Sequence, residues 1–349
     1  MKGNWTIRQL CAAVLGACAA AMTATSCAGF IFDDRSGCVS GVQVSFRYDY
    51  NLQRADMFEE HVGEVTVYVF DGQGRFILSQ TTDRDSGSGL FIDLQEGSYY
   101  LVALAHQDSY TGDPSLPGAQ FIRTVPDPGG RMADLQVVLE CGEDQDGIFK
   151  VRHDGLPLDT LWHAWTPVPV SVDRTGYTDA ELSLVRDTKR ISVSVRDLDR
   201  KGGSRAEYYE LTVTDCNGRL CYDNSVDGAD TVLYTPYITW NTAAEGSYDS
   251  TARAEFMTSR IVCHDDPAED ARLRIVEKAS GRAAVDVSLP DLLGSMAGYD
   301  ELQRYSSQEF LDRGYDYSLS FYLSGGEWKY VTVTIGVLGW SRKIQNVDI

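Results

Sequence analysis

The chain has 349 residues, with 43% hydrophobic and 23% charged residues and a formal net charge of −20. This length accommodates two domains of ordinary size. Phosphate backbones and anionic lipid head groups repel so acidic a chain, so its charge argues against nucleic-acid binding and against electrostatic attachment to a membrane.

Residues 1–26 have the pattern of a secretion signal. Lys2 and Arg8 precede a short apolar run, and small residues at 24–26 lead to Cys27. The run is too short for a membrane span, and a cysteine at the cleavage point can accept lipid. We therefore expect a lipoprotein signal peptide over 1–26 and lipidation at Cys27. Several acyl chains on one cysteine make membrane attachment stable.

Two alternatives to Cys27 lipidation remain open. Cys18 also follows small residues and is the better lipid-attachment motif on local sequence, but cleavage there leaves part of the apolar signal core on the mature chain. The segment also fits an ordinary secretion signal without lipid.

The first half of the mature chain has the pattern of short β-strands. Apolar and polar residues alternate in several runs, and Asp71-Gly72-Gln73-Gly74 marks a hairpin turn between two of them. The predicted strands are 42–48, 65–70, 76–78, 90–94, 98–105 and 133–139. Short strands separated by turns, without a glycine-rich strand-to-helix junction, favour a β-sandwich over a βαβ sheet.

The second half repeats the strand pattern and adds one helix. Ser306 with Glu309 predicts the helix start and Gly314 its end, and weaker helical signal extends back through 292–305. A last hairpin, 317–323 with 329–335, turns at Gly325-Gly326. The other predicted strands are 180–184, 191–195, 209–213, 231–234, 252–257, 273–276 and 284–287. The pattern predicts an all-β protein of two tandem sandwich domains, 27–165 and 166–349, with one short helix in the second.

Five further cysteines follow Cys27, and an exported chain can form disulfides. Cys38 precedes the first strand and Cys141 follows the last strand of the first half, so a bridge between them would close that domain. Cys216 and Cys221 flank an Asn-Gly turn and would pair across a hairpin. Cys263 is then left over, and the sequence alone does not fix the pairing. The alternative is that all five cysteines are buried free thiols.

No pattern in the sequence indicates catalysis, a cofactor or a bound metal. The five histidines have no metal-ligand spacing, and no Gly-x-Ser-x-Gly motif is present. His163 lies between Trp162 and Trp165, which indicates packing. Residues 223–228 imitate the first half of a calcium loop, but Tyr234 stands at the twelfth position, where a glutamate is required. We expect neither an enzyme nor a metal site.

Together, the motifs resemble the fimbrial anchor subunits of type V pili, the lipoproteins that hold these fibres to a Gram-negative outer membrane. Their order and spacing agree over nearly the whole mature chain. The matching parts are Cys27 with 32–38, then 65–74, Leu161-Trp162-His163-Ala164, 307–313, Trp328 and Gly339-Trp340. Leu338 departs from the family pattern, where an asparagine is expected, and the lipid-attachment motif is loose.

The resemblance implies two transthyretin-like domains without catalytic activity, at the base of a fibre. Such a protein is located at the cell outer membrane, is lipid-anchored and surface-exposed, and limits fibre length. The implied partners are fimbrial stalk subunits (pilins), joined by strand addition, and the outer membrane, reached through the lipid. We expect 330–349 to take part in the contact with the neighbouring subunit, through Tyr330, Val331, Val333, Ile335 and Trp340.

Two other functions compete with the anchor. The first is a surface glycan-binding or tip adhesin lipoprotein of the same sandwich architecture, because nineteen tyrosines and six tryptophans fit sugar stacking as well as packing. The second is a secreted enzyme, which needs a convergent polar pocket that the sequence does not indicate.

Overall fold

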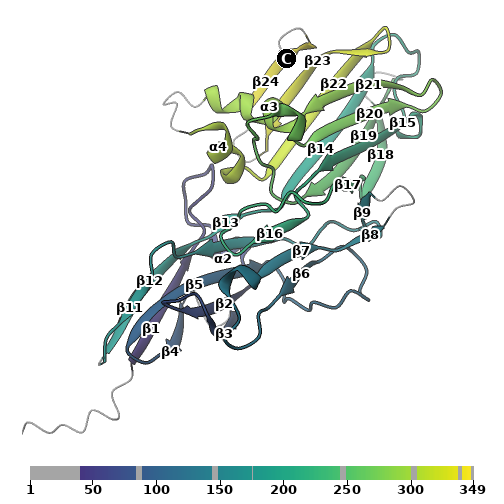
Figure 1. Ribbon diagram of the computed structural model, residues 1–349. Coiled ribbons are helices and arrows are strands. Elements are labelled where there is room, and N and C mark those ends of the chain that lie inside the picture. Colours follow the sequence, from purple (N-terminus) through teal and green to yellow (C-terminus); the bar gives the residue numbers. More distant parts are fainter. Residues whose placement is uncertain are drawn as a thin grey trace, which may run out of the picture.

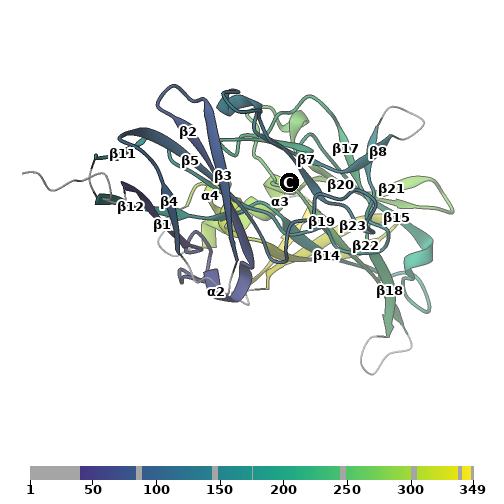
Figure 2. The ribbon, with the colours of Figure 1, turned by 90° about the horizontal axis from the view of Figure 1, so that it is seen from below.

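The computed structural model describes residues 40–83, 89–143, 148–174, 176–243, 249–299, 305–336 and 340–346. Strands dominate these ranges and form two β-sandwiches that lie end to end (Figures 1 and 2). The all-β prediction is confirmed.

The N-terminal sandwich packs a sheet of three strands on a sheet of six. Val44 of the smaller sheet and Val67 and Leu101 of the larger sheet are all fully buried in the core between the two. The smaller sheet has the order β12 (Gly176–Ser183), β1 (Ser40–Arg47), β4 (Gly89–Asp93). The larger has the order β13 (Val185–Arg186), β10 (Trp162–Trp165), β5 (Gly97–His106), β2 (Glu64–Asp71), β3 (Phe76–Asp83), and β11 (Val170–Val172) also pairs with β5.

The larger sheet of this sandwich is covered on both faces. Val65, Val67 and Val69 of β2 belong to the core just described, whereas Tyr68 and Phe70 point the other way and are also buried. A small third sheet covers that second face, with the order β16 (Arg219–Cys221), β7 (Gln136–Leu139), β6 (Phe121–Thr124). This double burial explains why aromatic residues alternate with valines along β2.

The C-terminal sandwich consists of two six-stranded sheets. Ile191, Phe321 and Val333 of one sheet pack with Leu211 and Ile275 of the other. The first sheet has the order β18 (Ile238–Ala243), β19 (Ser250–Thr258), β14 (Lys189–Asp197), β22 (Asp316–Ser324), β23 (Glu327–Ile335), β24 (Trp340–Gln345). The second has the order β21 (Arg282–Ser288), β20 (Arg272–Glu277), β15 (Tyr209–Asp215), β17 (Val232–Tyr234), β9 (Phe149–Val151), β8 (Cys141–Glu143).

The predicted helix is present as α4 (Ser307–Arg313), and Gly314 ends it. Ser306 Oγ accepts from the Glu309 N–H at 3.1 Å, but the Glu309 carboxylate accepts from Arg313 and does not return to the cap. The weaker signal before it corresponds to α3 (Leu289–Gly294) and the 3₁₀ turn η6 (Ser295–Tyr299). Short elements elsewhere are α2 (Phe58–His61), η3 (Met132–Asp134), η4 (Ala206–Tyr208) and η5 (Pro267–Glu269).

The two sandwiches are not consecutive segments of the chain. Strands β8 and β9, within 141–151, belong to the C-terminal sandwich, and the chain then returns for β10 to β13, within 162–186, in the N-terminal one. The expected division at residues 165 and 166 therefore passes between β10 and β11, which both pair with β5. Sequence patterns locate strands but do not reveal which sheet each one joins.

The expected Cys216–Cys221 disulfide is absent, because the hairpin that would carry it does not form. Cys216 follows β15 in the C-terminal sandwich, whereas Cys221 ends β16, which pairs with β7. Both are free thiols, as are Cys141 and Cys263. Cys38, the expected partner of Cys141, lies outside the described residues.

Candidate functional site

The described chain begins at the pole of the molecule farthest from the C-terminal sandwich (Figure 1). Ser40 opens β1 there, and its hydroxyl donates to the Leu94 carbonyl at 2.8 Å. At the other end of β1 the chain reaches the C-terminal half, where Arg313 stacks on Tyr50 at 3.9 Å from the ring centroid. Eight strand residues separate these two ends by about 25 Å. Cys18 and Cys27, the two candidate lipid acceptors, precede the described residues.

Strand β24 forms one edge of the C-terminal sheet, near the opposite pole (Figure 1). It pairs in antiparallel register with β23, from Ile335 opposite Trp340 to Tyr330 opposite Gln345. No other strand within the described ranges pairs with β24. β24 is therefore the edge strand of this sheet among the described residues, and edge strands are the places where a partner strand can be added.

The predicted contact residues divide into two groups. Val331, Val333 and Ile335 are fully buried between the two sheets, so in this structure their side chains belong to the core. Strand β23 is also paired on both sides. Tyr330 faces outward, where its ring stacks on Tyr322 at 4.4 Å. Trp340 opens the edge strand itself.

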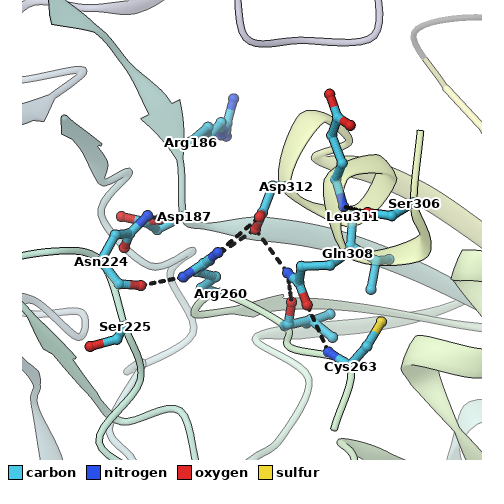
Figure 3. A network of polar contacts seen from close by, with 12 residues as sticks. Arg186, Asp187, Asn224, Ser225, Arg260, Cys263, Ser306, Gln308, Leu311 and Asp312 are labelled. Atoms are coloured by element: carbon cyan, nitrogen blue, oxygen red, sulfur yellow. Dashed lines mark hydrogen bonds and ion pairs between the residues drawn. The ribbon is translucent and has the colours of Figure 1, made fainter. Parts of the chain in front are cut away.

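A buried ionic cluster joins the two sandwiches (Figure 3). Arg260 donates from two nitrogens to the two carboxylate oxygens of Asp312 in α4, each at 2.8 Å, and also donates to the Asn224 carbonyl. Gln308 donates to Asp312 at 3.0 Å and accepts from the Cys263 N–H at 2.8 Å. The cluster fixes α4 and the loop after β19 to the turn after β16.

Asp187 and Lys189 bring the segment between the sandwiches into this cluster. Asp187 lies between β13 and β14, and its N–H donates to the Leu161 carbonyl at 2.9 Å. Lys189 is buried and donates to three carbonyls, those of Arg186, Asp312 and Gly314, at 2.8, 3.1 and 2.8 Å. A buried ammonium with all three donors used fixes the backbone around it. These hydrogen bonds therefore hold in place the segment between β13 and β14, where the chain passes from one sandwich to the other.

The segment that imitates a calcium loop serves this cluster instead. Asn224 Nδ2 donates to Asp187 Oδ1 at 2.9 Å, and Asp223 Oδ1 accepts from Ser225. Both side chains are thus engaged within the turn and the cluster. Within the described ranges, no group of three or more His, Cys, Asp or Glu side chains is placed to hold a metal ion. The sequence offered no signal for the cluster itself, because its members are scattered between 187 and 312.

His163 has a packing role, as its flanking tryptophans indicate. Trp162 is fully buried, and His163 Nε2 lies 2.7 Å from the Tyr222 carbonyl. Burial lowers the pKa of His163 to about 4, so the ring is neutral at physiological pH and donates this hydrogen bond.

Asp187 should make the stability of the protein depend on pH. Burial raises the pKa of its carboxyl from the usual 3.8 to about 7. Between these values the native state retains a proton that the unfolded chain has released, so this contribution to stability falls as the pH rises through the window. The Asp187→Asn side chain cannot ionise. At pH 8 the free energy of unfolding of this variant should therefore be about 1–3 kcal/mol higher than that of the wild type.

The comparison uses urea unfolding of both proteins at pH 5 and pH 8. The two stabilities should converge towards pH 5, and Asp286→Asn, at an exposed position, should show no such trend. A difference between Asp187→Asn and wild type that is the same at both pH values would contradict the assignment.

The fold and sequence together define a class of surface protein related to fimbrial anchors. The chain matches the family of fimbrillin-A associated anchor proteins Mfa1 and Mfa2 over residues 35–346. The chain belongs to this family, which is one of structural anchor proteins. Within the described ranges, no helix combines the length and apolar character needed to cross a bilayer.

Individual relatives agree with the family. The minor fimbrium anchoring subunit Mfa2 of Porphyromonas gingivalis is 25% identical over 322 residues, covering 90% of this chain and 89% of the relative. A crystal structure of candidate polysaccharide-binding proteins from Bacteroides thetaiotaomicron has a TM-score of 0.70 and 26% identity, covering 88% of this chain and 99% of that one. The solved structure of the fimbrial anchor protein Mfa2 from P. gingivalis has a TM-score of 0.57 and 19% identity, covering 87% of this chain and 99% of that one.

Proposed function

We propose that this protein is the base subunit of a cell-surface fimbria, tethered to the outer membrane through lipid on Cys27. The observation that carries the proposal is that the start of the described chain and strand β24 lie near opposite poles of the molecule. The described chain begins at one pole, at Ser40, and strand β24, at the edge of its sheet, lies towards the other. Twelve residues separate Cys27 from Ser40, enough for a tether of up to about 40 Å.

The buried cluster supports the same function. A fibre base transmits pulling force from its partner to its tether, and that force crosses the junction between the sandwiches. Asp312, Arg260 and Lys189 connect the crossing segment to α4 through hydrogen bonds that are shielded from water. Shielded, charge-assisted bonds are stronger than exposed ones.

Strand addition at β24 is the proposed mode of attachment to the fibre. A strand from a pilin would continue the six-stranded sheet beyond β24 and satisfy its outer backbone groups. Because lipid occupies the N-terminus of the base subunit, no further subunit would add below it, and growth would stop there. This accounts for a limit on fibre length.

Deleting the gene and imaging the cells tests the whole proposal. Without a base subunit, fibres should become longer and be released into the medium. Fibres of normal length that remain attached to the deletion strain would overturn the anchor function.

The role of β24 has its own prediction. Deleting residues 342–349 removes most of the strand and should release fibres from cells that still carry the protein in the envelope. Lys343→Ala is the matched control, because it keeps the backbone edge and changes only one exposed side chain. Thermal unfolding of the purified truncation identifies any loss of folding, and cell-bound fibres of normal length would contradict the prediction.

A glycan-binding adhesin is the second candidate. The relative described as polysaccharide-binding favours it, as does the stacked Tyr322–Tyr330 pair on the outer face of the first C-terminal sheet. Direct binding to a glycan array, lost in Tyr322→Ala, together with fibres that remain attached after gene deletion, would support the adhesin over the anchor.

A further inference from the structure

A cleft of about 690 Å³ opens between the two sandwiches. Its N-terminal wall comes from three loops, within 107–111, 116–120 and 156–160, and from Arg186 in β13. Its C-terminal wall includes Arg190, Tyr237, Glu255 and Met257. This volume lies within the range of clefts that bind ligands or peptide segments. The cleft is separate from the edge of β24.

Arg186 is the unusual residue of this cleft. Its side chain is 8% exposed, and its guanidinium lies over the rings of Tyr315 and Trp162, at 4.3 and 5.2 Å from the centroids. Within the described ranges, no carboxylate lies within ion-pair distance of it, and its buried Nε has no hydrogen-bond partner. In Figure 3 the side chain points away from the neighbouring carboxylate of Asp187.

An unpaired buried cation is costly, because water has been removed and no anion replaces it. The absence of a directly paired carboxylate is notable because the chain has a net charge of −20 and many carboxylates. The guanidinium has two aromatic faces as contacts, and the nearby carboxylate of Asp316 pairs with Arg190 at 4.0 Å. An incoming anion would therefore supply the direct ion pair that Arg186 lacks.

Three of the other charged groups of the cleft have partners, and a fourth, the exposed carboxylate of Asp108, lies at its rim. Glu255 accepts from Arg190 at 3.0 Å and from the Tyr237 hydroxyl. Asp159 Oδ2 lies 2.9 Å from Nδ1 of His106. Glu255 and Asp159 thus contact groups within the protein, and Arg186 is the lining cation that no carboxylate of the described ranges pairs with.

The rest of the lining indicates what carries that anion. Leu116, Leu156, Leu158 and Met257 supply aliphatic surface, and Leu116 and Leu156 are 40% and 44% exposed. Sugar rings usually stack on aromatic side chains. Among the lining residues described, Tyr237 is the one aromatic side chain, and its hydroxyl donates to Glu255, so the lining does not favour a sugar. Aliphatic contacts beside a charged anchor fit a polypeptide with a carboxylate next to apolar side chains.

We propose that this cleft binds an acidic peptide segment of a neighbouring fimbrial subunit, with an Asp or Glu carboxylate paired to Arg186. This inference rests on the proposed anchor function and adds a second contact to the one at β24. The bidentate fork of arginine suits a carboxylate, and exclusion of water strengthens the pair.

The test places a photo-crosslinking amino acid at Leu156 in cells that carry fimbriae. Mass spectrometry should identify an adduct with a fimbrial subunit, at a peptide containing Asp or Glu. The same crosslinker at Leu198, which is 50% exposed outside the cleft, is the positional control. Arg186→Gln should reduce the yield from Leu156 at least tenfold, whereas Arg274→Gln, on an exposed face of β20, should not.

Stability measurements separate loss of the pair from loss of the fold. Removal of an uncompensated buried charge should leave the melting temperature of purified Arg186→Gln unchanged or higher. Exchange of charges gives a second test: Arg186→Glu should lose the adduct, and replacement of the identified partner carboxylate by arginine should restore it.

The outcomes distinguish the inference from the function on which it rests. An undiminished adduct in Arg186→Gln, an adduct with glycan, or no adduct in cells whose fibres still depend on the gene would overturn the inference and leave the anchor function intact. Attached fibres after gene deletion would overturn the function itself.

Discussion

Replacing Asp312 by alanine is expected to lower the free energy of unfolding by about 3–5 kcal/mol. Asp312 is 7% exposed, and its two carboxylate oxygens accept from two of the three nitrogens of the Arg260 guanidinium. Removing the carboxylate leaves Arg260, whose side chain is only 17% exposed, charged and without its ion-pair partner, because little water reaches it. Urea unfolding followed by circular dichroism measures the loss.

Asp286→Ala is the matched control for Asp312→Ala. Asp286 pairs with Arg272 at 2.7 Å, but both side chains are about half exposed, at 45% and 44%. Water screens such a pair, so its loss should cost less than about 1 kcal/mol. Equal destabilisation by the two variants would show that the cluster does not hold the junction.

Replacing Cys27 by alanine should move the protein from the envelope to the soluble fraction and release fibres with it. Acyl chains on this cysteine supply the membrane affinity, since the acidic protein gains none from anionic lipid. Without them, the membrane-bound fraction should fall by at least about 100-fold. Fractionation with immunoblotting, together with radiolabelled palmitate, measures both the location and the modification.

Cys18→Ala is the control for this experiment and should remain lipidated and membrane-bound. Loss of label in Cys18→Ala but not in Cys27→Ala would move the attachment site to Cys18. A wild-type protein that incorporates no palmitate, or a Cys27→Ala protein that stays in the envelope, would contradict lipid anchoring at Cys27.

Local patterns predicted the elements well where one physical cause was sufficient. Helix α4 was expected from Ser306, whose hydroxyl accepts from the Glu309 N–H at its start, and from Gly314, where the chain becomes extended. The hairpin of β22 and β23 was expected from alternation around two glycines, and both glycines have positive φ, at 65° and 81°. These features depend on neighbours in sequence.

Expectations failed where the result depended on distant partners. Asn217-Gly218 had the composition of a hairpin turn, yet β15 and β16 join different sheets, so Cys216 and Cys221 do not meet. Val331, Val333 and Ile335 had the apolar character of an interface, and in this structure the opposing sheet covers them. An apolar side chain indicates burial without indicating which surface buries it.

Strand content and the limits of helix α4 could be predicted from the amino-acid sequence, because periodicity and capping act over a few residues. The secretion signal with a cysteine at its cleavage zone stays a prediction. Long-range packing established that β8 and β9 join the C-terminal sandwich, that Arg260 meets Asp312, and that the Arg186 guanidinium lies over Tyr315. The reason is physical: pairing between strands and between buried charges is set by long-range packing, and residues far apart in the chain carry no local mark of the partner they will meet.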